Sequence, residues 1–401
     1  WLYDDSTSKW IQIDTSNTPS PTMRDRSAMA SLGDGSILLF GGYNGAAHQY
    51  DSWIFNKNTK WTWLNINKAS SPPARDDHTM AKVGNKIVLF GGYEGAKRLT
   101  HDTWLFTDNT KSWTKVTIPL FKAPDKRSQH AMAPLGRDNI IMFGGDIGSN
   151  NKYFDDTWLI DHTMAWTQIK SSTSPSGRDS IAMASLGDSI GKILLFGGFN
   201  GTHLSDTWLF DKATHEWTET KTAISPKHRD RHKMVPLKEG TVFLFGGYNY
   251  IDLWFGDSWI FYYSTSKWQQ IDSSSTSISP ATRDNHGMAS LGNGMAVLFG
   301  GHSGNVIAMR DTWVFEQSTD QWTQVIFPSQ TKIPCKRYNH AMTTLGDNKA
   351  VLYAGYDHTG TFLDDTWLFH TGTDKKWTWT KLATQMDGRR RTEAGGPGPR
   401  I

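Results

Sequence analysis

An arginine recurs at an equivalent place in seven segments of this 401-residue chain. A guanidinium group binds a carboxylate through two parallel hydrogen bonds, so seven such groups brought together would suit an acidic partner. The chain also offers its own acids, because an aspartate lies 27 to 29 residues after each arginine, two residues before a tryptophan. The sequence therefore leaves two alternatives, a partner-binding ring and a set of internal ion pairs. The arginines are Arg24, Arg75, Arg127, Arg178, Arg229, Arg283 and Arg337.

Some repeats carry additional side chains suited to a partner. Lys126 and Lys336 precede the third and seventh arginines, which lack a following acid, and the fifth repeat adds Arg231. The fifth repeat also places Tyr250 and Trp254 in a stretch that is polar in the other repeats. Exposed aromatic and basic residues are typical interface anchors, although such a loop can equally pack on its neighbour. We expect these residues to contribute to a partner-binding surface.

No sequence motif for catalysis or metal binding is found. The chain has 1 cysteine, Cys335, which excludes a Cys-x-x-Cys site. It contains no phosphate-binding loop, no His-Glu-x-x-His and no Gly-x-Ser-x-Gly. We therefore expect no enzymatic activity, no metal and no cofactor.

The arginines belong to a repeated unit that must position them. An apolar run ends in a glycine pair seven times, with second glycines 49 to 54 residues apart, a period typical of propellers and solenoids. Each unit is expected to form four short strands, of which the second is apolar on consecutive residues and therefore buried on both faces. The second glycines are Gly42, Gly92, Gly145, Gly198, Gly247, Gly301 and Gly355.

Tryptophan follows the same period, which explains why the chain has 19 of them. The first tryptophan of each unit starts the third strand, and a second one, such as Trp61 or Trp377, starts the fourth. Trp63, Trp254 and Trp379 are interpreted as lying outside the pattern. We expect the first tryptophan to approach the second glycine, which would explain why Ala354 replaces a first glycine whereas Gly355 is kept. The first tryptophans are Trp53, Trp104, Trp158, Trp208, Trp259, Trp313 and Trp367.

The double glycine, the two spaced aromatic residues and the period near fifty resemble the kelch motif. The particular sequence pattern of these repeats is similar to that of host cell factor, attractin and the central domain of galactose oxidase. The resemblance implies an all-β kelch β-propeller with blades of four antiparallel strands around a channel lined by the first strands. In kelch-like ubiquitin-ligase adaptors, arginines at the matching position contribute to a pocket for acidic peptides, and by that resemblance the seven arginines form a candidate binding ring.

The number of blades is left open between seven and an incomplete ring of eight, and seven is favoured. We expect the propeller over residues 1–384, with a partial blade at 1–13 and a disordered tail at 385–401. The repeats are expected at about 24–65, 75–117, 127–169, 178–219, 229–271, 283–325 and 337–381.

Composition and charge narrow the range of functions expected of the chain. The formal charge of +3 argues against nucleic acid as the main partner, and no apolar run is long enough to span a membrane. We expect a cytoplasmic, non-catalytic scaffold or adaptor that binds a protein partner, with an acidic segment as the favoured chemistry. The docking face would carry the arginines and the loops between second and third strands. The alternative is a carbohydrate-binding or carbohydrate-active propeller, of the sialic-acid mutarotase type, that uses the central cavity.

Overall fold

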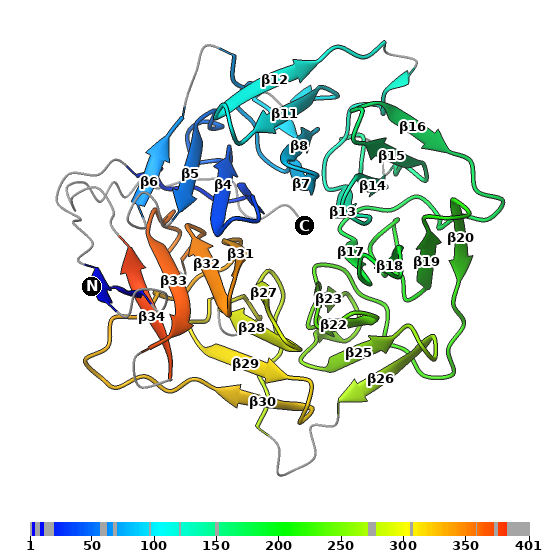
Figure 1. The fold of residues 1–401 in the computed structure, drawn as a ribbon. Coiled ribbons are helices and arrows are strands. Elements are labelled where there is room, and N and C mark those ends of the chain that lie inside the picture. The colour runs from blue at the N-terminus through cyan, green and yellow to red at the C-terminus, as the bar shows by residue number, and fades with distance from the viewer. Residues whose placement is uncertain are drawn as a thin grey trace.

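The computed structural model shows a ring of seven four-stranded sheets arranged like blades around a central axis (Figure 1). It describes residues 2–4, 9–11, 20–56, 62–66, 70–95, 98–119, 122–148, 152–271, 278–304, 308–357, 359–372 and 376–382. These residues contain strands and no α-helix. The all-β propeller and its seven blades, expected from the repeats, are confirmed.

Each blade uses its strands in chain order from the axis outwards, and all neighbouring strands are antiparallel. Blade 1 comprises β3 (Ala28–Ser31), β4 (Ser36–Phe40), β5 (Ser52–Asn56) and β6 (Thr62–Asn65). Blade 2 comprises β7 (Thr79–Val83), β8 (Lys86–Phe90), β11 (Thr103–Thr107) and β12 (Ser112–Val116). Blade 3 comprises β13 (Ala131–Pro134), β14 (Asn139–Phe143), β15 (Thr157–Asp161) and β16 (Trp166–Ile169). Blades 4 and 5 comprise β17 (Ala182–Ser185), β18 (Lys192–Phe196), β19 (Thr207–Asp211) and β20 (Glu216–Glu219); β21 (Lys233–Pro236), β22 (Thr241–Phe245), β25 (Ser258–Tyr262) and β26 (Lys267–Ile271). Blades 6 and 7 comprise β27 (Gly287–Gly292), β28 (Met295–Phe299), β29 (Thr312–Glu316) and β30 (Gln321–Gln324); β31 (Ala341–Gly346), β32 (Lys349–Tyr353), β33 (Thr366–Thr371) and β34 (Trp377–Leu382).

Within the described residues, three short hairpins lie outside the blades. They are β1 (Leu2–Asp4) with β2 (Lys9–Ile11), β9 (Tyr93–Glu94) with β10 (Arg98–Leu99), and β23 (Tyr248–Asn249) with β24 (Leu253–Trp254). The first hairpin corresponds to the partial blade expected at 1–13. The tail expected at 385–401 lies outside the described residues, and the expected domain limits stay predictions.

The strands pack as their sequences predict. Every residue of β4 is buried, because the consecutive apolar side chains of a second strand contact the neighbouring blades on both faces. The outermost strands are buried only in part, as in β16, where Trp166 is buried and the next two residues are exposed. The core therefore lies between adjacent blades, in clusters that each join two sheets.

The ring closes between the last blade and the first. The innermost strand β31 lies beside β3, as each innermost strand lies beside the next. The Gly355 N–H donates a 3.0 Å hydrogen bond to the Arg24 carbonyl, and Trp63 Nε1 donates a 2.7 Å bond to Thr366 Oγ1. Contacts between residues more than 300 positions apart thus hold the two ends of the propeller together.

The assignment of the second tryptophans was wrong in two blades. In each blade one buried indole donates a hydrogen bond to the Ser or Thr hydroxyl that starts the third strand of the preceding blade, as Trp113 does to Ser52 at 2.8 Å. In blade 1 this residue is Trp63, which lies opposite Phe55 in the strand register, and in blade 7 it is Trp379, which lies opposite Phe369. Trp377 is only half-buried. The alternation of a Trp-x-Trp sequence allows either indole to face the core, and the sequence alone did not decide which.

The reason given for the strict second glycine was also wrong. A Cβ at Gly355 would lie 2.7 Å from His340 Cβ and 2.9 Å from the Tyr338 carbonyl oxygen, so the segment that leads into the blade's own first strand, and not a tryptophan, excludes it. Gly355 also has a φ of 101°, which favours glycine. Ala354 has a φ of 61° and faces blade 1, where Ser27 stands in place of the histidine that is present at five of the other six interfaces.

Candidate functional site

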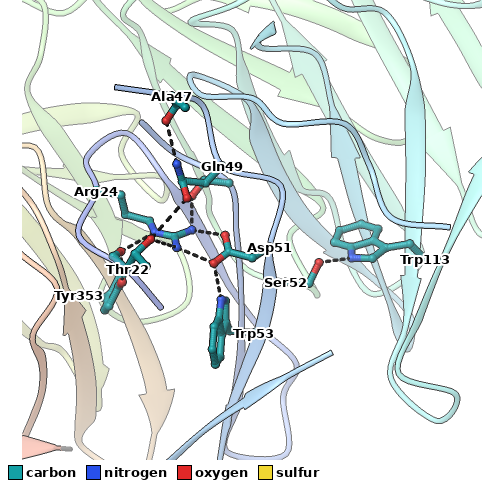
Figure 2. A network of polar contacts seen from close by, with 10 residues as sticks. Thr22, Arg24, Ala47, Gln49, Asp51, Ser52, Trp53, Trp113 and Tyr353 are labelled. Atoms are coloured by element: carbon teal, nitrogen blue, oxygen red, sulfur yellow. Dashed lines mark hydrogen bonds and ion pairs between the residues drawn. The ribbon is translucent and has the colours of Figure 1, made fainter. Parts of the chain in front are cut away.

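The repeated arginines are buried inside the blades. Arg24 donates to both carboxylate oxygens of Asp51, at 2.5 and 2.6 Å, and to the carbonyl of Gly41 at 2.8 Å (Figure 2). Asp51 Oδ2 also accepts a 2.6 Å hydrogen bond from Trp53 Nε1. The guanidinium, the carboxylate and the indole thus form one network that fixes the start of the third strand.

All seven blades repeat this network, and all seven arginines are 0% exposed. The pairs are Arg24 with Asp51, Arg75 with Asp102, Arg127 with Asp156, Arg178 with Asp206, Arg229 with Asp257, Arg283 with Asp311 and Arg337 with Asp365. The internal-pair alternative therefore describes these arginines. The expectation that these arginines bind a partner is wrong. Each guanidinium has no exposed surface and already makes two hydrogen bonds to a carboxylate, so it has nothing left to offer a partner.

The ion pairs lower the pKa values of Asp102 and Asp365. Burial alone would raise the pKa of Asp102, but hydrogen bonds from Arg75 and Trp104 hold it below its usual range. The same balance lowers the pKa of Asp365, which is bound by Arg337 and Trp367. These carboxylates are charged, paired and structural.

The arginine backbone joins each blade to the one before it. The Gly42 N–H donates 2.8 Å to the Arg75 carbonyl, and the Arg75 N–H donates 3.0 Å to the Gln49 carbonyl. Because the equivalent pairs recur at every blade boundary, these arginines determine how the ring assembles. Their repetition reflects a structural role.

One face of the propeller carries most of the exposed large apolar side chains of the described residues. Antiparallel order places the loops into the first strands and the loops between second and third strands on the same side, which we call the loop face. Of the 8 most exposed large apolar residues in the described part of the chain, only Leu64 lies elsewhere, on β6. The others are Tyr50, Ile224, Tyr250, Ile251, Leu253, Ile278 and Ile326.

The remaining sequence candidates lie on the loop face. Lys126 and Lys336 are exposed, and the Arg231 side chain is 36% exposed. Tyr250 is 53% exposed, at the tip of the loop in blade 5. Trp254 is half-buried: its indole lies against Gly304 of blade 6 and meets the His302 ring at 5.6 Å, so it packs on its neighbour.

A second set of charged groups lies at the centre of the loop face, and of these the sequence analysis singled out only Arg231 and did not foresee how the groups meet across blades. The residue after each buried arginine forms a β-bridge with the residue after the glycine pair, as Asp25 does with Tyr43. The next residue has a left-handed φ near 50° in every blade and varies: Arg26, Asp77, Gln129, Ser180, Arg231, Asn285 and Asn339. The sequence signal that could have revealed these residues is that this position varies from blade to blade, while the arginine two residues before it is the same in all seven.

Two of these variable residues are arginines, and each lies between two carboxylates and an aromatic ring; Arg26 also lies 3.6 Å from a third carboxylate, that of Asp77. Arg26 lies 3.3 Å from Asp25, 3.0 Å from Asp76 of the next blade, and 5.5 Å from the Tyr43 ring centre. We call this arrangement of two carboxylates and one aromatic ring a rim bracket. Its guanidinium is held by charge and by a cation–π contact.

Blade 5 repeats the rim bracket with Arg231. This guanidinium lies 3.6 Å from Asp230, 3.7 Å from Asp284 of the next blade, and 5.6 Å from the Tyr248 ring centre. A rim bracket is therefore a recurrent guanidinium site of this fold.

The central channel contains a cavity of about 230 Å³. It is lined by Met29, Lys233, His286, Met288, His340 and Met342, among others. Burial lowers the pKa of His286 and of His340 well below the usual histidine range, so both rings are neutral. In the described residues, no group of three or more His, Cys, Asp or Glu side chains is arranged to hold a metal ion. None of the described segments is a helix long and apolar enough to cross a membrane.

The chain is similar to known kelch proteins over nearly its whole length. The model of the KLHDC2/KLHL20/DRC7 Kelch-repeats domain matches residues 1–198 and 191–395. Kelch domain-containing protein 2 of Bos taurus is 25% identical over 318 residues, which cover 77% of this chain and 68% of that protein. F-box/kelch-repeat protein At1g51550 of Arabidopsis thaliana is 26% identical over 277 residues, or 62% of this chain and 56% of that protein.

A third relative shows how variable the context of these repeats is. The dynein alpha chain of the flagellar outer arm of Chlamydomonas reinhardtii is 27% identical over 272 residues, but these cover only 6% of that protein. The chain thus spans about half, or much less, of the length of the first curated relatives it matches. The matches give no support to the carbohydrate-active alternative.

Proposed function

Because this chain belongs to the kelch-repeat propeller family, we propose that it is a protein-interaction module whose docking surface is the loop face. The observation that supports this proposal is the location of the exposed apolar side chains. Isolated exposed apolar residues are ordinary, but a bias to one face is typical of a surface that is covered by a partner. The loops that present these residues are positioned by a rigid set of blades, as in other binding surfaces.

The experiment compares partner capture by the tagged full chain and two variants. The test variant combines Ile224→Asp and Ile251→Asp, whose side chains are 63% and 78% exposed on the loop face. The control is Leu64→Asp, because Leu64 is 45% exposed on the outer strand of blade 1. Proteins that bind the wild type and the control should be recovered at least tenfold less with the double variant. Equal recovery with all three proteins would refute the loop face as the docking surface.

An acidic partner, as suggested by the sequence, would have to use the lysines of the loop face. Lys126 and Lys336 are exposed, whereas the seven buried arginines have no free surface. Replacing both lysines by glutamate should weaken binding of a polyglutamate peptide and reduce its salt dependence, since exposed charges are screened. Unchanged affinity at two salt concentrations would remove the acidic-segment hypothesis and leave the docking face in place.

A further inference from the structure

Blade 4 contains a rim bracket without an arginine. Both carboxylates of a bracket are present in only three of the seven blades, namely blades 1, 4 and 5. In blade 4 they are Asp179 and, in the next blade, Asp230, and the ring is Phe199, which forms the β-bridge with Asp179. Ser180, with a φ of 50°, stands where blades 1 and 5 have Arg26 and Arg231.

The match between blades 1 and 4 extends to a fourth group. In blade 1, His48 Nδ1 lies 3.3 Å from Asp76, and its ring centre lies 5.2 Å from that of Tyr43. In blade 4, His203 Nε2 lies 3.6 Å from Asp230, and its ring centre lies 5.1 Å from that of Phe199. The two carboxylates, the ring and the histidine of the bracket therefore correspond, and the guanidinium is missing in blade 4. The brackets also differ at one neighbouring position, because Asp77 lies 3.6 Å from Arg26 in blade 1 and its counterpart beside the blade 4 bracket is Arg231.

The carboxylates of blade 4 are buried without a full set of partners. Asp179 is 9% exposed, and no ion pair to it is found within the described segments. Asp230 is 4% exposed, and its Oδ1 accepts no hydrogen bond from the described residues. Asp230 is already within 3.6 Å of Arg231, on the side of blade 5, whereas Asp179 has no cation at ion-pair distance among the described residues. A buried carboxylate is costly without a positive charge or donors beside it, so the Asp179 side of this bracket favours a cation. Burial and the charges of Asp146 and Asp230 raise the pKa of Asp179 to about 7.

Aromatic and apolar side chains surround the opening of this bracket. The Phe199 ring centre lies 6.2 Å from that of Tyr153 in blade 3 and 6.0 Å from that of Tyr250 in blade 5. Beyond Tyr250, Ile251 and Leu253 are 78% and 48% exposed. These groups suit the aliphatic stem of an arginine and an apolar neighbour beside it.

We propose that the rim bracket of blade 4, formed by Asp179, Asp230 and Phe199, binds an arginine side chain of a protein partner. The guanidinium takes the place that Arg26 fills in blade 1 and Arg231 fills in blade 5. This inference rests on the proposed docking role of the loop face and specifies the chemistry of one position on it.

The test uses the peptide acetyl-Gly-Arg-Gly-amide as the probe, with a citrulline peptide as the neutral isostere. Binding to the full chain is followed by backbone amide NMR shifts at pH 8, where Asp179 is ionised. We expect the arginine peptide to shift the amides of Asp179, Ser180 and Phe199, and the citrulline peptide to bind at least tenfold more weakly. Equal binding of the two peptides, or shifts located elsewhere, would overturn the proposal.

Two arginine substitutions give a matched pair of variants. Ser180→Arg supplies the guanidinium from the chain itself and should abolish peptide binding, whereas Asn285→Arg should leave it unchanged. Asn285 has a φ of 49° at the equivalent place in blade 6, where Tyr338 replaces the second carboxylate. Asp179→Asn should weaken peptide binding at least tenfold, with Ser180→Ala as the variant that retains it.

The outcomes separate the two proposals. If Ser180→Arg or Asp179→Asn binds the peptide like the wild type, the arginine site is refuted. The loop face still stands in that case, provided that Ile224→Asp with Ile251→Asp loses the captured partners. If the double variant captures the same partners while the peptide binds as described, the bracket is a guanidinium site and the docking face is refuted.

Discussion

Blades 1 and 4 have the same internal network and differ at the rim. In both, a fully buried arginine, Arg24 or Arg178, binds an aspartate through two hydrogen bonds. At the rim, the carboxylates, the aromatic ring and the histidine also correspond, but Arg26 in blade 1 is replaced by Ser180 in blade 4. The comparison separates charges that assemble the propeller from charges that are available to a partner, although both belong to arginines and aspartates close together in the sequence.

The largest expected effect comes from the shared network and should be equal in the two blades. Arg24→Met and Arg178→Met each leave a carboxylate, Asp51 or Asp206, without its guanidinium. Breaking a buried ion pair by removing one partner costs about 3–5 kcal/mol. Chemical denaturation should show similar losses for both variants. A loss below about 1 kcal/mol in either blade would contradict the structural role that we assign to these arginines.

The repeat sequence was sufficient to predict the parts of the fold that every blade shares. Consecutive apolar residues predicted the buried second strands, and the regular spacing of arginine and aspartate made their pairing one of two alternatives. Pattern alone did not separate Trp63 from Trp61, because both suit the same alternating strand. It also did not reveal the rim bracket, since Asp179 and Asp230 are 51 residues apart in sequence and meet only where two blades adjoin.

The second prediction concerns the pH dependence caused by the missing guanidinium. Asp179 has a pKa of about 7, raised by burial and by Asp146 and Asp230, with Arg231 as the opposing charge. In the unfolded chain an aspartate has a pKa of about 3.9, so the folded state holds the proton more tightly. The contribution of Asp179 to stability therefore falls as the pH rises from about 4 to about 7.

Asp179→Asn removes this penalty, so its gain in stability over the wild type should grow between pH 5 and pH 8. One pKa unit corresponds to about 1.4 kcal/mol, and about two pH units separate pH 5 from the folded-state pKa of about 7, so we expect the gain to grow by about 2–3 kcal/mol from pH 5 to pH 8. Urea unfolding at the two pH values measures it. Asp25→Asn is the comparison in blade 1: burial raises the pKa of Asp25 to about 6 although Arg26 opposes the rise, so its gain should also grow between pH 5 and pH 8, but by less than that of Asp179→Asn. A gain for Asp179→Asn that is the same at both pH values would show that its ionisation does not affect stability.

The smallest expected effect on stability comes from converting blade 1 into a copy of blade 4. Arg26 is 39% exposed, so its ion pairs are screened by solvent and Arg26→Ser should cost less than about 1 kcal/mol. The variant nevertheless leaves Asp25 and Asp76 beside Tyr43 without a guanidinium, and the pKa of Asp25 should rise above its value of about 6. If a rim bracket is by itself a guanidinium site, Arg26→Ser should bind two arginine peptides per chain where the wild type binds one. Arg26→Lys keeps the charge in the bracket and should still bind one peptide. A single peptide bound to Arg26→Ser would mean that the flanking Tyr153 and Tyr250 of blade 4, and not the bracket, determine the site.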